Sequence, residues 1–207
     1  MTFVAVLDYG IGNLRSAQKA LQRQGADARL TADVEEIRRA DGVVLPGVGA
    51  FGRCMEALRE ARLDGVALEA SASGRPFLGI CIGMQMLYEA SEESPGVKGL
   101  GIMPGVVRLL PEGVKRPQMQ WNRLDIPCPH PLFEGLPERP WMYFVHSYAP
   151  YDPDHAVATC DYGGPVVAAA ARDNVWATQF HPEKSGDNGL ALLSNFLRAC
   201  SARTVAA

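Results

Sequence analysis

The chain has 207 residues, of which 47% are hydrophobic and 21% charged, a balance typical of a soluble globular protein. Its formal net charge of −3 and the lack of a basic run give no indication of nucleic-acid or anionic-membrane binding. No apolar segment approaches the length of about 18 residues that spans a membrane, and we expect one domain over residues 1–207.

The N-terminus and the cysteines predict a cytoplasmic protein. Residues 1–10 enter an apolar run without a positively charged segment, so we expect no signal peptide. The five cysteines are odd in number and widely scattered, which argues against a disulfide framework and for a reducing compartment. Cysteines and histidines show no zinc-site spacing, and we expect no metal and no cofactor.

Strands alternate with helices in the first half of the chain. This order predicts a parallel sheet covered on both faces, with ligands bound beyond the carboxyl ends of its strands. The loops at 8–13, 46–52 and 81–83 lie at that edge. The predicted strands are 3–7, 28–30, 42–45 and 77–80, and the predicted helices are 14–21, 33–39, 53–61 and 65–71.

The second half has a different pattern. A Pro-rich stretch at 111–140 shows little regularity, although residues 119–122 interrupt it. Short links between the later strands predict antiparallel pairing. We therefore predict an α/β fold: a mostly parallel central sheet flanked by helices, with a C-terminal antiparallel extension. The later strands are predicted at 106–110, 143–148, 156–159, 166–170 and 175–180, and a closing helix at 188–200.

Residues 79–83 read Gly-Ile-Cys-Ile-Gly, the cysteine version of the G-x-S-x-G nucleophile elbow. Cys81 stands where a strand turns into a helix that the apolar residues up to Tyr88 can form. A sharp turn strains its central residue and brings neighbouring segments close, which flanking glycines permit. It also directs the N–H of Ile82 at whatever the sulfur attacks. The alternative is a buried small hydrophobic residue, because a nucleophile needs a base elsewhere.

Of the four histidines, His181 is the best candidate for that base. It ends an apolar strand, a proline follows it, and Glu183 comes two residues later, so the carboxylate can orient the imidazole. His146 alternates with apolar residues and is either a core histidine or part of a site. We expect His130 and His155 at the surface.

A G-x-G-x-x-G pattern occurs at Gly47, Gly49 and Gly52. A dinucleotide site would need it in the first βαβ unit with an acid ending the next strand, and neither condition holds. The loop is better suited to supply a backbone N–H beside Cys81, because an oxyanion hole in this architecture uses one donor from a neighbouring strand-end loop. A tight turn without chemistry is the alternative.

These motifs together resemble the class I (triad) glutamine amidotransferases, which have a flavodoxin-like fold. Within that superfamily they are similar to the glutaminase subunits of imidazole glycerol phosphate synthase, which serve histidine biosynthesis. The resemblance covers essentially the whole chain, with its motifs in order. It is carried by residues 8–14 (DYGIGNL), 46–52 (PGVGAFG), 79–85 (GICIGMQ), the Glu92–Glu93 pair, 143–148 (YFVHSY) and 181–185 (HPEKS).

The resemblance implies a glutaminase in which Cys81 attacks the side-chain amide of glutamine and forms a thioester. His181 is then the base and later the acid toward leaving ammonia, and Glu183 orients His181. In this family the PGVG peptide is thought to turn its N–H toward the oxyanion in response to a ligand on the partner. The implied oxyanion donors are the backbones of Ile82 and of Val48 or Gly49, and the implied glutamine-binding residues are Gln85, Glu93, Ser147 and Tyr148.

The resemblance also implies a heterodimer with a (β/α)8-barrel cyclase subunit, which receives the ammonia. Its expected interface includes Trp121, Asn122 and Lys184. One departure falls there: the family usually has Met-Gly-Trp-Asn where this chain has Gln120 after Met119. Glutamine lacks the backbone freedom of glycine, so we expect the local backbone and the interface packing to differ.

Three other readings stay open. Another class I amidotransferase subunit, such as the one serving pyridoxal phosphate synthesis, would share the triad but not the DYG and PGVG motifs. A thiol hydrolase or peptidase on the same scaffold would be active without a partner. An interaction subunit with a vestigial site would not need all three of Cys81, His181 and Glu183.

Overall fold

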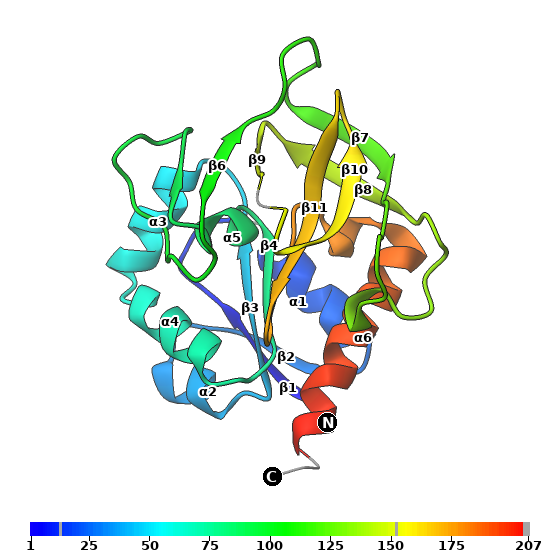
Figure 1. The fold of residues 1–207 in the computed structure, drawn as a ribbon. Helices are drawn as coiled ribbons and strands as arrows, with labels where there is room; N and C mark the ends of the chain where they lie inside the picture. Colours follow the sequence, from blue (N-terminus) through cyan, green and yellow to red (C-terminus); the bar gives the residue numbers. More distant parts are fainter. Residues whose placement is uncertain (13, 152, 205–207) are drawn as a thin grey trace.

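The computed structural model describes residues 1–12, 14–151 and 153–204, so that Asn13 of the predicted N-terminal motif lies outside it. Its centre is a seven-stranded sheet in the order β10-β11-β12-β4-β3-β1-β2 (Figure 1). Pairing is parallel from β12 to β2 and antiparallel among β10, β11 and β12, which confirms the predicted fold class. The strands are β1 (Phe3–Leu7), β2 (Asp27–Thr31), β3 (Gly42–Gly47), β4 (Phe77–Cys81), β10 (Ala156–Asp161), β11 (Pro165–Arg172) and β12 (Val175–Thr178).

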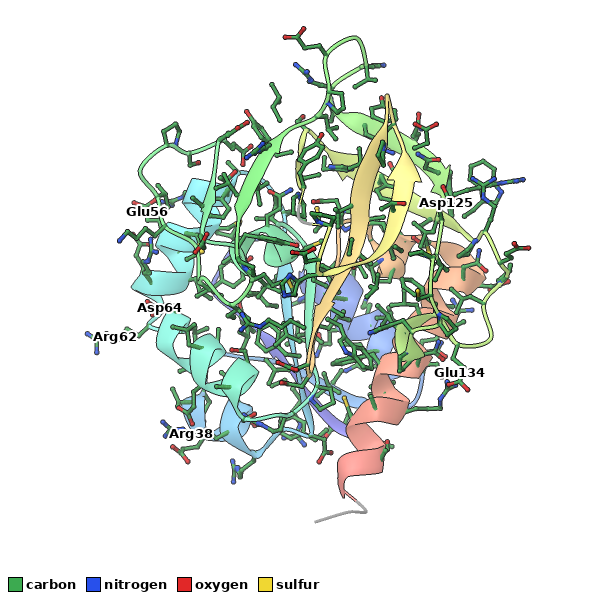
Figure 2. The ribbon with its side chains drawn as sticks, viewed as in Figure 1. Arg38, Glu56, Arg62, Asp64, Asp125 and Glu134 are labelled. Carbon is green, nitrogen blue, oxygen red and sulfur yellow. The ribbon has the colours of Figure 1, made fainter. Side chains whose placement is uncertain are left out.

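Helices cover both faces of this sheet. Helices α2, α3 and α4 lie on one side, and α1 and α6 lie on the other (Figure 1). Their apolar faces pack against the strands, while charged side chains such as Arg38, Glu56 and Glu134 point into solvent (Figure 2). The α-helices are α1 (Leu14–Arg23), α2 (Val34–Arg39), α3 (Phe51–Glu60), α4 (Asp64–Ala72), α5 (Ile82–Met86) and α6 (Gly186–Thr204), with short 3-10 turns η1 (Pro131–Phe133) and η2 (Pro182–Lys184).

The helix prediction holds best where the apolar spacing is clearest. The apolar residues Leu14, Ala17, Ala20 and Leu21, whose spacing predicts α1, are all buried. The elbow helix α5 is shorter than predicted and ends at Met86, five residues after the strand. None of the helices in the described part of the chain combines the length and the apolar character needed to cross a membrane.

Two smaller sheets carry the segment between Ala90 and Pro150. The first pairs β5 (Ala90–Ser91), β6 (Val106–Leu109) and β9 (Tyr148–Pro150), and the second pairs β7 (Gln118–Arg123) with β8 (Trp141–His146). Strand β7 covers residues 119–122, the part of the sequence that interrupts the irregular Pro-rich stretch. Gln120 pairs with Phe144 in an unbroken antiparallel register, without a left-handed backbone.

The prediction of one strand over residues 143–148 is wrong. His146 pairs with Gln118 in β8, whereas Tyr148 pairs with Leu109 in β9, so the chain changes partner at Ser147. The predicted strand at 175–180 also ends early, at Thr178. At His146 and at Thr178 the chain therefore stops pairing with its neighbouring strand. The residues that follow each of these strand ends can face a site instead of a neighbouring strand.

Helix α5 lies unusually close to strand β3. A Cβ atom added at Gly83 would stand 1.8 Å from the carbonyl oxygen of Leu45, and one added at Gly47 would stand 2.8 Å from the Gly83 nitrogen. Only glycine lets backbone approach backbone in this way. Gly83, two residues after Cys81, is therefore required by the packing as well as by the sequence motif.

We predict that Gly83→Ala destabilises the protein by at least about 1–3 kcal/mol, which is the usual cost of overpacking a core. Gly65→Ala is the matched control, since Gly65 lies in α4 with no atom within 4 Å of its added Cβ. Because alanine favours helix over glycine, that control should be neutral or stabilising by up to about 1 kcal/mol. Urea unfolding of both variants checks the prediction, and equal stabilities would contradict it.

Candidate active site

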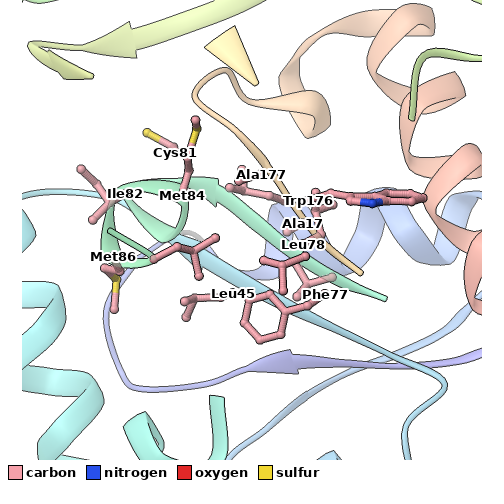
Figure 3. Close-up of a cluster of buried hydrophobic side chains, with 14 of the residues drawn as sticks. Ala17, Leu45, Phe77, Leu78, Cys81, Ile82, Met84, Met86, Trp176 and Ala177 are labelled. Carbon is pink, nitrogen blue, oxygen red and sulfur yellow. The ribbon is translucent and has the colours of Figure 1, made fainter. Parts of the chain in front are cut away.

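Cys81 occupies a strained backbone position at the end of β4. Its φ of 55° and ψ of −111° lie outside the regions that non-glycine residues normally adopt. Figure 3 shows it at the end of the strand, beyond the apolar side chains of Leu78, Leu45 and Phe77. Its register partner is Gly47, the last residue of β3, which brings the end of that strand and its turn into α3 (residues 46–50, called the Pro46–Ala50 loop below) beside it. Strain of this kind persists only where the surroundings enforce it, and it concentrates at functional sites.

His181 reaches the same place from strand β12. That strand pairs in parallel with β4, with Thr178 opposite Ile80, so His181 follows at the same edge of the sheet as Cys81. Its Nδ1 lies 2.8 Å from Glu183 Oε1, and both side chains are buried, at 4% and 7% exposure. Cys81 lies in the wall of the same cavity as this ring and interacts with it electrostatically. The structure thus brings together the three residues predicted as nucleophile, base and orienting acid.

The electrostatics of His181 follow from those two partners. Burial alone would lower its pKa, but the interactions with Cys81 and Glu183 and the negative charge of both raise the pKa from 6.5 to about 10. The imidazole therefore carries its proton at neutral pH. A protonated ring beside the sulfur is the state that can later give a proton to a leaving group.

His146 lines the same site but has the opposite behaviour. Its ring nitrogens lie 2.9 Å from the Tyr148 carbonyl and 2.8 Å from the Gln118 side-chain amide, with no carboxylate among these contacts. Burial, together with the charge of the nearby His181, lowers its pKa from 6.5 to about 4, although the hydrogen bond to Tyr148 opposes this shift. His146 is thus a neutral residue that holds the chain where β8 gives way to β9. Both roles left open for it from the sequence, core and site-lining, apply.

A cavity of about 350 Å³ opens above the thiol. All predicted oxyanion and glutamine-binding residues line it, as does Lys184, whereas Trp121 and Asn122 do not. Pro117, Val145 and His146 complete the wall, and of these only His146 was considered from the sequence. The predicted residues in the wall are Val48, Gly49, Ile82, Gln85, Glu93, Ser147 and Tyr148.

Gln85 offers an unused acceptor to this cavity. Its Nε2 donates to the Tyr148 carbonyl at 2.9 Å and to Gln179 Oε1 at 3.1 Å. Its Oε1 is buried and has no hydrogen-bond partner in the described part of the chain. A buried orphan acceptor is costly unless a ligand donor satisfies it. Gln179, whose Nε2 lies 3.9 Å from Cys81 Sγ, was missed in the sequence, where it reads as one more strand residue.

Glu93 joins the cavity to helix α3. Its Oε2 accepts the Phe51 N–H at 2.7 Å, and Ser94 Oγ accepts the next N–H, of Gly52, at 3.0 Å. Both contacts satisfy donors at the start of a helix that have no partner within it. Glu93 therefore lines the cavity while one of its carboxylate oxygens caps the helix that follows the Pro46–Ala50 loop.

The backbone donors expected to hold an oxyanion are not engaged elsewhere. No hydrogen bond among residues 1–12, 14–151 and 153–204 uses the N–H of Val48, Gly49 or Ile82. Ile82 is the first residue of α5, where a helix N–H points outward without a partner. Preorganised N–H groups beside a nucleophile are what acyl transfer requires.

A larger hollow, of about 580 Å³, lies elsewhere, along residues 126–138. His130 is there, but its Nδ1 accepts the Leu132 N–H at 3.2 Å, and no carboxylate orients it. His130 and His155 are partly exposed, as expected for surface residues, and neither lines the cavity above Cys81. Size alone therefore does not identify the reactive site, and the smaller cavity holds the nucleophile, the base and the free donors.

Comparison with known proteins agrees with this geometry. Residues 5–200 match the family described as Glutamine amidotransferase class-I. The chain is 51% identical to the imidazole glycerol phosphate synthase subunit HisH of Methylococcus capsulatus, over 96% of this chain and 97% of that one. Its identity to the HisH subunit of Synechococcus elongatus is 50%, over 96% and 94% of the two chains.

Solved structures show the same fold. A crystal structure described as glutamine amidotransferase gives a TM-score of 0.75 at 21% identity, covering 96% of this chain and 98% of that one. The structure of PurLQS from Thermotoga maritima gives 0.74 at 19%, covering 95% and 98%. The chain belongs to the class I glutamine amidotransferase family. Within that family its sequence places it among the HisH subunits of imidazole glycerol phosphate synthase.

We predict that the two buried histidines titrate far apart. By NMR, His181 should keep its proton to well above pH 8, and His146 should stay neutral to well below pH 6. In Cys81→Ala the pKa of His181 should fall, because one of its two anionic partners is lost, while that of His146 stays low. A His181 resonance that titrates near 6.5 in the wild type would contradict this assignment.

Proposed function

We propose that this chain hydrolyses the side-chain amide of glutamine at Cys81 and passes the ammonia to a cyclase partner subunit. One observation carries the proposal: a strained, buried thiol shares a cavity with a histidine that a carboxylate holds at 2.8 Å, beside backbone donors with no partner in the described part of the chain. Membership in the amidotransferase family supports glutamine as the substrate.

Glutamine fits the cavity by its polar ends. The Glu93 carboxylate would bind the α-ammonium group, because it is the acidic side chain of the cavity wall apart from the triad. The unused Oε1 of Gln85 accepts a further substrate N–H. Ser147 and Tyr148, freed where β8 gives way to β9, would complete the binding of the amino-acid end.

The chemistry then follows from the charges in place. The Cys81 sulfur attacks the amide carbon, and the N–H groups of Ile82 and of Val48 or Gly49 stabilise the oxyanion. His181 gives its proton to the departing nitrogen, so ammonia leaves and a γ-glutamyl thioester remains. His181 then takes a proton from water, whose oxygen attacks the thioester and releases glutamate. Glu183 holds His181 in orientation through both steps.

A partner subunit receives the ammonia. The name of the relatives, synthase subunit, supports such a partner, and we propose a (β/α)8-barrel cyclase. The surface beside the triad fits an interface: Trp121, at 47% exposure, stacks edge-on with Tyr143 on strands β7 and β8. The backbone of Tyr143 bonds the η2 segment on both sides, accepting the N–H of His181 and donating to Ser185 Oγ, each at 3.0 Å. A partner bound to the β7–β8 pair (the β7–β8 hairpin) would therefore be separated from the general base His181 by strand β8 alone.

The proposal is tested by measuring glutamate release from glutamine by this chain alone, with the cyclase, and with the cyclase plus its nucleotide ligand. We expect strong activity only in the last mixture. Cys81→Ala should abolish glutamate release there, while the same complex still makes product from added ammonia. Loss of the ammonia-driven reaction in the variant would mean that Cys81 has a different role.

We predict that Trp121→Ala weakens binding of the cyclase by at least about tenfold, because a central exposed aromatic residue typically dominates an interface. Leu68→Ala is the control, since Leu68 is similarly exposed, at 42%, but lies on α4 at the opposite side of the sheet. Titration calorimetry with the purified cyclase measures both. Equal affinities of the two variants would exclude the β7–β8 hairpin as the interface.

A further inference from the structure

Two buried amide side chains, Gln85 and Gln179, lie in contact beside the nucleophile. Gln179 is fully buried, and Gln85 is only 1% exposed. The Oε1 of Gln179 accepts a hydrogen bond from Gln85 Nε2 at 3.1 Å, and its Nε2 lies 3.9 Å from Cys81 Sγ. The proposed mechanism gives Gln85 a role in binding glutamine, but it gives none to Gln179.

The direction of each hydrogen bond in this pair follows from the groups around it. The Tyr148 carbonyl can only accept, so Gln85 turns its nitrogen toward it, at 2.9 Å. The second hydrogen on that nitrogen goes to Gln179 Oε1, which leaves the Gln179 nitrogen on the side of the Cys81 sulfur. If the Gln179 amide were reversed, two NH₂ groups would face each other. The pair therefore has one arrangement in which each donor meets an acceptor.

This arrangement leaves one atom of Gln85 for a ligand. Both hydrogens of its nitrogen are engaged, and its Oε1 has no hydrogen-bond partner in the described part of the chain. The bond to Tyr148 alone would let the amide pivot about a single contact, whereas the second bond, to Gln179, fixes its plane. Gln179 is itself held in place, because its backbone N–H donates to the Ala168 carbonyl of β11 at 2.8 Å.

We propose that Gln179 is a positioning residue: its side-chain oxygen fixes the Gln85 amide, so that Gln85 Oε1 is held ready to accept an N–H of the bound glutamine. The inference deepens the proposed function and rests on it. Gln85 is part of the cavity wall and Gln179 is not, so Gln179 acts on the substrate through Gln85. Its contact with the Cys81 sulfur is a separate matter, which the test removes.

The test measures glutamine binding in the Cys81→Ala variant, in complex with the cyclase and its nucleotide ligand. This background does not turn glutamine over, and it has no sulfur for Gln179 to contact. In titration calorimetry, adding Gln179→Met should weaken glutamine binding about tenfold, because methionine has a similar length but offers no comparable acceptor to Gln85. Adding Gln179→Glu instead should keep the affinity within about threefold, since an oxygen for Gln85 remains.

A double-mutant cycle shows whether the effect passes through Gln85. Gln85→Met should weaken binding by itself, and adding Gln179→Met to it should weaken binding no further, because the two side chains act as one unit. Asn195→Leu is the matched control. It removes a buried amide of α6 that donates to the Leu132 and Glu134 carbonyls, away from the cavity, and should change the affinity by less than about twofold.

Each result decides the matter. Unchanged binding in Gln179→Met would overturn the inference, and so would a tenfold loss in Gln179→Glu. Losses from Gln85→Met and Gln179→Met that multiply in the double variant would mean independent roles and would overturn it as well, as would an equal loss in the Asn195→Leu control. A Cys81→Ala complex that binds no glutamine with both amides intact would instead reject the proposed function, and the inference with it.

Discussion

The site depends on one close contact, the approach of the α5 backbone to strand β3 at Gly83 and Leu45. Because no side chain separates the two segments, the elbow and the Pro46–Ala50 loop form one packed unit. Gly47 fits between the Gly83 nitrogen and the Tyr9 hydroxyl, with no room for a Cβ on either side. This packing enforces the strained backbone of Cys81, and it places the free N–H of Ile82 near the loop that supplies the second donor. The positions of the nucleophile and of the backbone donors are therefore set by backbone packing and not by side-chain contacts.

Electrostatics then divides residues of like type into unlike roles. His181 and His146 line one cavity, and burial disfavours a charge on either ring. Glu183 and Cys81 both raise the pKa of His181, and their combined effect outweighs its burial. His146 bonds a carbonyl and an amide and stays neutral, so it adds no positive charge to compete for the thiol. For these two histidines the interacting partners decide the role, and the residue type does not.

Much of this could be read from the sequence, because the strong signals are local. Apolar runs and glycines give the parallel strands, and the short motifs at Cys81 and His181 give the nucleophile and its base, which the parallel pairing of β4 and β12 brings to one edge. The failures lie where a partner is distant along the chain. Residues 119–122 show in the sequence only as an interruption of the Pro-rich stretch, because their ladder partner β8 lies beyond it. The break at Ser147 is invisible until two sheets compete for one segment. The position of Gln179 beside Cys81 depends on contacts that no periodicity encodes.

The parallel pairing of β4 with β12 has a consequence for the order in which the protein is made. Phe77 pairs with Val175, so the nucleophile leaves the ribosome long before its base. Until β12 arrives, the β4 strand is a bare, entirely apolar sheet edge, the kind of surface that invites pairing with other chains. A chain cut short before β12 would carry a thiol with no general base and an edge with no neighbour. The reactive centre is therefore assembled only by completing the sheet, and an unfinished subunit has nothing with which to consume glutamine.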